Sequence, residues 1–194
     1  MTSNILAFDT ASAHCAACLI AGDKVIVRVD PMAKGQAEHL MPMLAEVLTE
    51  SGLTWADLDA IGVGTGPGNF TGIRISVSAA RGLALGLGVP AVGVTHLEAQ
   101  VHGLPRPVVA QVSAPRGQVY LQSFADDVGK AALFPVDDEQ VKDAPAIISA
   151  EQMVQNIAKI AQGRAKQSPE RPAPYYVRAA DAAPPRDAAP VILS

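Results

Sequence analysis

Residues 62–90, which read GVGTGPGNFTGIRISVSAARGLALGLGVP, constrain the fold more than any other part of the chain. Ile61 and Val63 alternate with glycines, which predicts a short buried strand. The run at 66–69 breaks regular structure, as a turn with unusual backbone angles does. Apolar residues then recur at helical spacing until Gly88, where the helix is expected to end. A strand, a glycine turn and a long helix in succession indicate an α/β unit.

The predicted helix carries glycines that need an explanation. Gly82 and Gly86 each cost about 1 kcal/mol relative to alanine in a helix interior. With Ala79, Ala80 and Ala84 they form a smooth surface that another backbone can approach closely. Close packing is therefore the first interpretation. The second is that free N–H groups at the helix start hold a phosphate or carboxylate.

As a generic nucleotide motif the glycine turn is incomplete. No lysine follows the glycines, so the P-loop pattern fails, and Asn69 stands where the third glycine of a dinucleotide fingerprint would be.

The start of the chain offers a second clue. A strand at 5–8 runs into Asp9 and Thr10, and a hairpin follows at 15–29. This order is typical of the entry to the actin-like ATPase fold, where the acidic residue and the hydroxyls face a nucleotide's metal and phosphates. A local turn held by the same side chains explains the pattern equally well. The candidate nucleotide- or anion-binding residues are Asp9, Thr10, Gly66, Gly68, Asn69 and Thr71.

Length and composition limit the classes of function. The chain has 194 residues and 49% hydrophobic residues, enough for one domain or for two small lobes. Its net charge of −4 argues against a broad nucleic-acid surface, so any contact with RNA is expected through a partner. We find no membrane span and no signal peptide, and we expect a cytoplasmic protein.

The two cysteines, Cys15 and Cys18, have the spacing of a redox or zinc motif. They fall in a predicted strand, which points them to opposite faces, and no second pair completes a zinc site. We interpret them as buried small side chains.

A second helix is predicted at Gln36–Glu50. Its apolar stripe of Leu40, Leu44 and Val47 is widened by further apolar residues, namely Met41, Met43 and Leu48. The surplus suggests a surface for a partner, although a deeply buried helix would have the same pattern. Pro42 either kinks this helix or marks its start.

Metal chemistry at Glu38 and His39 is not expected. A ligand pair on a helix needs a second histidine one turn on, where Met43 stands. We predict no metal site and no catalytic residue on this chain.

A second lobe is predicted from residue 104 onward. Two strands at 108–112 and 118–124 are followed by a polar, irregular stretch at 126–142 and a short strand at 146–148. A helix follows at 151–161, with Ser149 as its cap. We therefore divide the chain into a first lobe at 1–103, a reduced second lobe at 104–164 and a proline-rich tail at 165–194.

Several segments together resemble the TsaB family, the dimerisation subunit of the bacterial tRNA threonylcarbamoyladenosine machinery. The most specific is GPGNFTGIR at 66–74. The others are ILAFDTA at 5–11, AEHLMP at 37–42, residues 53–59, ARGLA at 80–84, VGV at 92–94 and PYYVR at 174–178.

The resemblance implies an actin-like (ribonuclease H-like) α/β fold of two related lobes, each with a mixed sheet flanked by helices. It implies a non-catalytic subunit, without a cofactor of its own, that binds a paralogous TsaD-type transferase. That partner uses ATP and a metal to modify the adenosine beside the tRNA anticodon, and a TsaE-type P-loop ATPase joins the assembly. Family members that lack the partner form homodimers, and tRNA is expected to be bound only through the complex.

The resemblance also implies that pairing uses the two first-lobe helices. The partner-binding residues expected here are Glu38, His39, Leu40, Met43, Leu44, Val47, Arg74, Val77, Ser78, Arg81 and Leu85.

The chain departs from the family pattern in its second lobe. Ser113 and Gln118 stand where the family usually carries carboxylates, and a strand expected before the last helix is missing. Both changes weaken the case for nucleotide hydrolysis, which needs acidic metal ligands. The alternative function is a stand-alone enzyme, either a glycoprotease-like metallopeptidase or an actin-fold ATPase.

Overall fold

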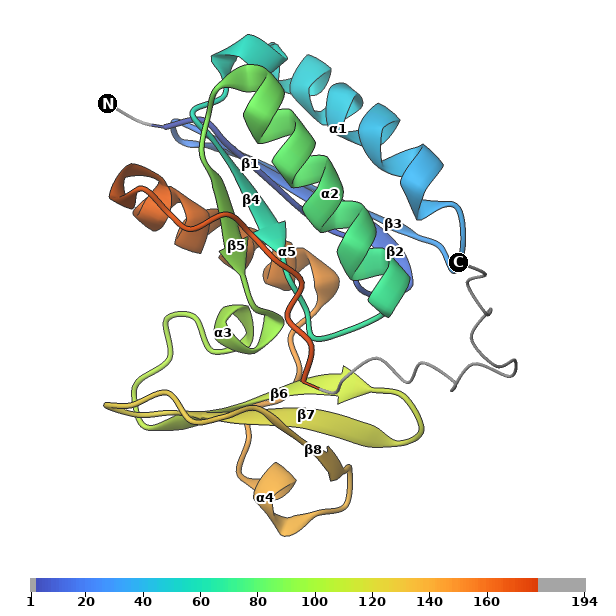
Figure 1. Ribbon diagram of the computed structural model, residues 1–194, viewed down its shortest axis with the longest axis vertical. Helices are drawn as coiled ribbons and strands as arrows, with labels where there is room; N and C mark the ends of the chain where they lie inside the picture. The colour runs from blue at the N-terminus through green and yellow to red at the C-terminus, as the bar shows by residue number, and fades with distance from the viewer. Residues whose placement is uncertain (1–2, 178–194) are drawn as a thin grey trace, which may run out of the picture.

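The computed structural model describes residues 3–177 and is shown in Figure 1. Its larger part is a five-stranded mixed sheet in the order β3-β2-β1-β4-β5. These strands are β1 (Ile5–Asp9), β2 (His14–Ala21), β3 (Lys24–Pro31), β4 (Ala60–Gly64) and β5 (Ala91–Val94). The strand β1 pairs antiparallel with β2 and parallel with β4, and β4 pairs parallel with β5. The predicted α/β architecture of an actin-like lobe is confirmed.

Three helices cover the two faces of this sheet. The helices α1 (Gln36–Ser51) and α2 (Phe70–Leu87) lie side by side on one face, and α5 (Ala150–Arg164) lies on the other (Figure 1). Each face therefore has its own apolar core, one between the sheet and α1 and α2, the other between the sheet and α5.

The strand β2 contributes to both cores. Cys15 belongs to the core beneath α1 and α2, whereas Cys18 belongs to the core beneath α5. Successive residues of a strand face opposite sides, so positions three apart also do. Both cysteines are free and buried, as predicted.

The helix α1 begins at Gln36, directly after Gly35, whose φ is 87°. Pro42 lies inside the helix, so it does not mark the helix start. The short 3-10 helix at Trp55–Asp57 is opened by a capping box between Thr54 and Asp57.

The second lobe contains a three-stranded antiparallel sheet in the order β6-β7-β8. Its strands are β6 (Val108–Ala114), β7 (Gln118–Phe124) and β8 (Ala132–Pro135), and the helices α3 (His96–Gln100) and α4 (Glu139–Lys142) flank it. The prediction of a strand at 146–148 was wrong, because this segment is irregular. Gln100 holds the segment through its side chain, which accepts from Ile148 N and donates to Ala146 O.

The strand β8 was missed, because it lies within the stretch predicted to be irregular. It pairs with β7 from Gln118 opposite Pro135 to Leu121 opposite Ala132. Ser149 caps α5 as predicted, through a bond from Gln152 N.

The helix α5 crosses back onto the first sheet, although its sequence falls within the segment assigned to the second lobe. The segment 168–177, which we call the strap, then runs along β5 between α2 and α5 (Figure 1). The lobe boundaries at 103 and 164 stay predictions. The rest of the predicted tail, residues 178–194, and with it Arg178 of the matched motif, lies outside the described residues.

Among residues 3–177, no helix is long and apolar enough to cross a membrane.

Candidate functional site

The carboxyl ends of the parallel strands β1, β4 and β5 meet at one edge of the first sheet, the place where α/β folds usually bind ligands. Asp9 ends β1 and is only 1% exposed. Its Oδ1 lies 2.8 Å from His96 Nε2, and its Oδ2 lies 3.3 Å from His14 Nε2. Ala11 N also donates to Oδ2 across 3.2 Å. We call Asp9, His14 and His96 the Asp9 centre.

His96 faces an acceptor at each ring nitrogen. Its Nδ1 lies 3.1 Å from the carbonyl oxygen of Pro67, while its Nε2 faces the Asp9 carboxylate. Both nitrogens donate only in the imidazolium form. Burial by itself lowers the pKa of His96, but attraction to Asp9 and the two hydrogen bonds raise the pKa above its ordinary value. The pair is therefore a buried ion pair.

The pKa of Asp9 shifts in the opposite direction. Burial by itself raises the pKa of its carboxyl, but attraction to His96 and the hydrogen bonds from His14 and His96 hold the pKa well below its usual range. A glycine is required beside the pair, because a Cβ at Gly64 would overlap Asp9 Oδ1.

The geometry limits what Asp9 can do chemically. Both carboxylate oxygens are bound by groups of this chain, and Thr10 Oγ1 donates to Gly72 O across 2.6 Å in a buried position. Among the described residues, no group of three or more histidine, cysteine, aspartate or glutamate side chains could hold a metal ion. The Asp9 centre ties β1, β2 and α3 to the turn before α2.

The glycine turn serves the start of α2. Asn69 caps the helix, because its Oδ1 accepts from Gly72 N across 2.8 Å, and Asn69 N donates to Ala11 O across 2.7 Å. A Cβ at Gly72 would overlap Thr10 O, and one at Gly68 would meet Ala11 O at 2.5 Å.

Gly68 and Gly72 therefore let the turn pack directly on the backbone that follows β1. The structure brings the six predicted nucleotide- or anion-binding residues together, with Thr71 exposed and Asp9, Thr10 and Gly66 buried. Their role in binding a ligand stays a prediction.

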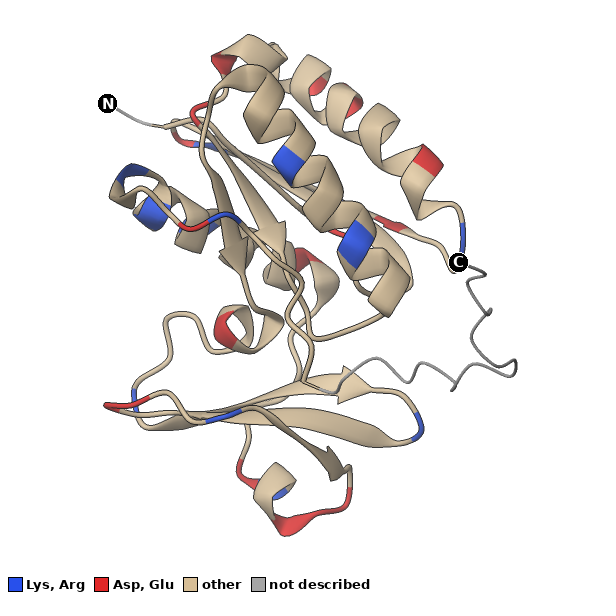
Figure 2. Ribbon diagram, in the orientation of Figure 1, with Lys and Arg blue, Asp and Glu red and all other residues tan. Residues whose placement is uncertain are grey.

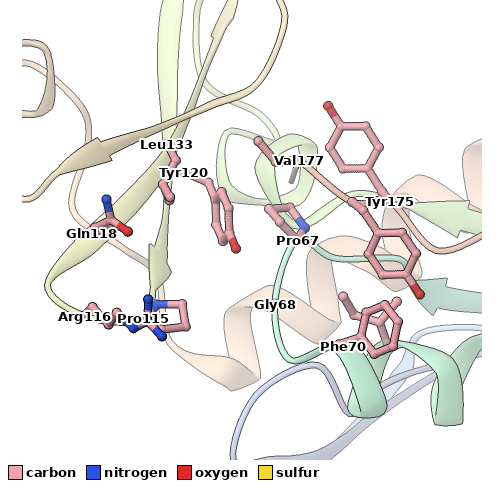
Figure 3. A pocket seen from close by; sticks show the side chains of 12 residues that line it. Pro67, Gly68, Phe70, Pro115, Arg116, Gln118, Tyr120, Leu133, Tyr175 and Val177 are labelled. Carbon is pink, nitrogen blue, oxygen red and sulfur yellow. The ribbon is translucent and has the colours of Figure 1, made fainter. Parts of the chain in front are cut away.

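A cleft of about 260 Å³ separates this turn from the hairpin of β6 and β7 (Figure 3). Gly68 and Phe70 line one side, and Arg116 and Gln118 line the other. Gln118, where the family pattern carries a carboxylate, thus presents a neutral amide to the cleft.

Five of the predicted partner-binding residues need correction. They are buried in the core beneath α1 and α2, where a partner cannot touch them: Leu40, Met43, Leu44, Val47 and Val77. The apolar surplus of α1 mostly reflects deep burial, the alternative that the sequence left open. Ala80, placed on the smooth surface of α2, is buried there too.

The remaining predicted partner-binding residues lie at the surface. Glu38, Arg74, Ser78 and Leu85 are exposed, and Leu85 is 80% exposed. Arg81 and His39 are partly exposed, and His39 Nε2 lies 2.6 Å from Asp30 Oδ2.

The helix α2 also exposes Gly82 and Gly86, where an added Cβ would meet no atom of the described residues within 4 Å. Packing among these residues therefore does not require either glycine. We call the exposed residues of this helix the α2 face: Phe70, Thr71, Arg74, Ser78, Gly82, Leu85 and Gly86.

The sequence analysis missed two features. His96 directly follows Thr95 at the end of β5, and the rule that parallel strands end at one edge could have placed it near Asp9. The strap carries Tyr176, which stacks on Phe70 with ring centroids 5.0 Å apart, and no sequence pattern indicates this contact across more than a hundred residues.

Comparisons with known proteins support the resemblance seen in the sequence. The family model described as TsaD, tRNA N6-adenosine threonylcarbamoyltransferase, matches residues 31–175. The chain is 35% identical over 128 residues to the tRNA threonylcarbamoyladenosine biosynthesis protein TsaB of Escherichia coli, covering 63% of this chain and 55% of that protein. It is 32% identical over 122 residues to the TsaB of Haemophilus influenzae, covering 60% of this chain and 51% of that protein.

The chain thus spans about half the length of these curated relatives. A Pseudomonas aeruginosa crystal structure, of an uncharacterized protein with similarity to peptidase YeaZ, superposes with a TM-score of 0.70. That match has 24% identity and covers 91% of this chain and all of the other, which establishes a shared fold.

Proposed function

Since this chain belongs to the TsaB/YeaZ family, we propose that it is the non-catalytic, partner-binding subunit in the threonylcarbamoyladenosine modification of tRNA. Its partner is the paralogous transferase, which binds the ATP and the metal and catalyses the transfer. A P-loop ATPase joins the complex, and tRNA reaches this chain only through the partner.

The observation that carries the proposal is the α2 face. Gly82 and Gly86 each cost the helix about 1 kcal/mol, and no contact among residues 3–177 compensates for them. Leu85 between them is 80% exposed. Glycines that leave room beside an exposed leucine suit the close approach of a helix from another subunit.

The charges of the two neighbouring helices support pairing through this side of the lobe. The helix α1 has no lysine or arginine and three carboxylates: Glu38, Glu46 and Glu50. The helix α2 has Arg74 and Arg81 and no carboxylate, and Figure 2 shows this separation of charge. A subunit of the same fold, docked across a two-fold axis, can place its acidic helix against the basic one.

A catalytic role is disfavoured by the state of the acidic groups. The Asp9 carboxylate is bound by two histidines, and the cleft between the sheets presents Gln118 where the family pattern has a carboxylate. Phosphate and metal chemistry in this fold needs free acidic ligands.

Sizing the chain with and without the transferase paralogue tests the proposal. We expect a stable heterodimer that Leu85→Asp prevents while leaving the thermal unfolding of the isolated chain unchanged. Val136→Asp is the matched control, because Val136 is also a highly exposed apolar residue but lies beyond β8 in the second lobe. Wild-type chain that does not bind the paralogue contradicts the proposal.

Transfer of the threonylcarbamoyl group to tRNA provides the functional measurement. We expect no transfer by the isolated chain and a strong increase when it is added to the paralogue and the P-loop ATPase. Tight metal binding and ATP turnover by the isolated chain would instead establish the enzyme alternative.

A further inference from the structure

The strap is fixed to the first lobe at several points. Pro172 is buried, and a Cβ at Gly93 of β5 would lie 3.1 Å from Pro172 Cβ. Tyr175 N donates to Thr65 O across 2.8 Å, directly after β4. The strap therefore has a defined path beside β5 instead of leaving the surface after α5.

Two adjacent tyrosines of the strap contact different parts of the molecule. Tyr175 packs against the core between α3 and the second sheet. Tyr176 stacks on Phe70 at the start of α2, and its hydroxyl accepts a hydrogen bond from Arg74 Nε across 3.0 Å. The Arg74 guanidinium also lies 3.6 Å from the centre of the Phe70 ring. Tyr176 thereby lies directly beside the α2 face, and Phe70 and Tyr176 are 37% and 38% exposed.

A groove of about 350 Å³ separates the end of α2 from the strap. Apolar atoms of Leu85, Val89 and Pro172 line it. Arg81 of α2 and Arg171 of the strap line it as well, so the groove joins an apolar surface to two guanidinium groups.

The surface formed by α2 and the strap is mainly positively charged. Arg74, Arg81 and Arg171 belong to α2 and the strap, and α2 has no carboxylate. Within the strap, Glu170 is the one acidic residue, and it is exposed. The region is therefore complementary to a segment that combines carboxylates with apolar side chains.

We propose that the strap is part of the partner-binding surface, and that the transferase paralogue places an acidic, apolar segment in the groove between α2 and the strap. The proposal rests on the proposed function, which supplies the partner, and it adds a second element of this chain to the contact. The strap also connects the core of the second lobe to that contact, through Tyr175 and Tyr176.

Charge reversal at Arg171 tests the proposal. Arg171 is exposed, so Arg171→Glu leaves the fold intact, which the thermal unfolding of the isolated chain checks. We expect the Kd for the paralogue to rise about tenfold at about 50 mM NaCl, and the difference to shrink at about 300 mM NaCl as the Debye length falls. The control Lys130→Glu reverses an exposed charge in the second lobe and leaves the Kd unchanged.

A second variant changes the affinity in the opposite direction. Glu170→Lys removes the carboxylate of the strap and is expected to lower the Kd at low salt. An affinity that neither Arg171→Glu nor Glu170→Lys changes, although the wild type binds, overturns the role of the strap and leaves the proposed function standing. Wild type that does not bind the paralogue overturns the proposed function itself.

Self-association of the chain, measured in parallel, identifies a different occupant. An effect of Arg171→Glu on self-association alone would assign the groove to a second copy of this chain and overturn the proposal.

Discussion

Asp9 and His96 form a buried ion pair across 2.8 Å, although 87 positions separate them in the sequence. The pair joins the end of β1 to the start of α3, and His96 continues the connection to Pro67 before α2. Removing one partner of such a pair leaves the other buried without compensation, so the pair should be sensitive to substitution.

We predict that His96→Ala lowers the free energy of unfolding by about 3 kcal/mol, because it leaves the Asp9 carboxylate buried without its cation. Equilibrium urea unfolding measures the difference. His102→Ala, which removes an exposed histidine six residues further along the chain, should change the stability little. Equal effects of the two substitutions would contradict the ion pair.

The pair also predicts how stability depends on pH. The pKa of His96 is raised on folding, so its contribution is complete below 6.5, the ordinary pKa, and is lost as the pH rises through the folded value. The pKa of Asp9 is lowered, so its contribution is present above 3.8 and is lost as the pH falls. Wild-type stability relative to His96→Gln should therefore be greatest between these pH values and decline on the alkaline side. A difference that does not decline as the pH rises well above 6.5 would contradict the ion pair.

Alanine substitutions at two glycines of α2 should have opposite effects on the stability of the chain. Gly72→Ala is expected to destabilise the chain by about 2 kcal/mol or more, because its Cβ overlaps Thr10 O. Gly82→Ala meets open space and should stabilise the isolated chain by about 0.5–1 kcal/mol. Thermal unfolding compares the two.

The same Gly82→Ala variant should weaken binding of the paralogue, because the added methyl group lies on the α2 face. Stabilisation without any loss of affinity would show that the partner does not approach this glycine.

Asn69 is expected to stabilise the start of α2 as its cap. Asn69→Ala should cost about 1 kcal/mol, whereas Asn69→Asp keeps an acceptor for Gly72 N and should cost little. Urea unfolding of both variants checks the prediction, which fails if aspartate is as harmful as alanine.

The cysteines should be unreactive in the folded chain. Burial, with the charges of Asp30 and Asp9, raises the pKa of Cys15 to about 11, and burial raises the pKa of Cys18 to about 12. Alkylation by iodoacetamide at about pH 8 should therefore be slow until a denaturant is added, because the thiolate is the reactive form. Rapid labelling of the native chain, followed by mass spectrometry, would contradict the burial.

The sequence was most informative where structure is local. The first-lobe strands, the helices of 36–51 and 70–87 and the cap at Ser149 follow from periodicity and from residues close in sequence. Periodicity also predicts which residues share a helix face.

Periodicity does not show what covers a face. The wide apolar face of α1 suggested a partner, yet Met43 and Val47 pack on this chain's own sheet. The sequence could not separate these cases, because the same residues suit either surface. The exposed glycines of α2 were recognised as costly from sequence, but only coordinates show that no part of the chain from residue 3 to residue 177 fills the space beside them.

The contacts between distant segments were the hardest to predict. His96 lies close to Asp9 only because of the order of the parallel strands, which local sequence patterns do not show. The strap was described only as a proline-rich tail, because the contacts of Tyr175 and Tyr176 depend on where α2 and the second sheet lie in space.

The opposite directions of Tyr175 and Tyr176 fix the length of the strap. Its path is held by Pro172 on one side and by the bond between Tyr175 N and Thr65 O on the other. Successive side chains of an extended segment point in opposite directions. One residue inserted or deleted between these points would therefore turn Tyr175 toward Phe70 and Tyr176 toward the core. A change of one residue in the length of the strap should therefore disturb both tyrosine contacts at once, whereas a substitution of either tyrosine changes only one of them.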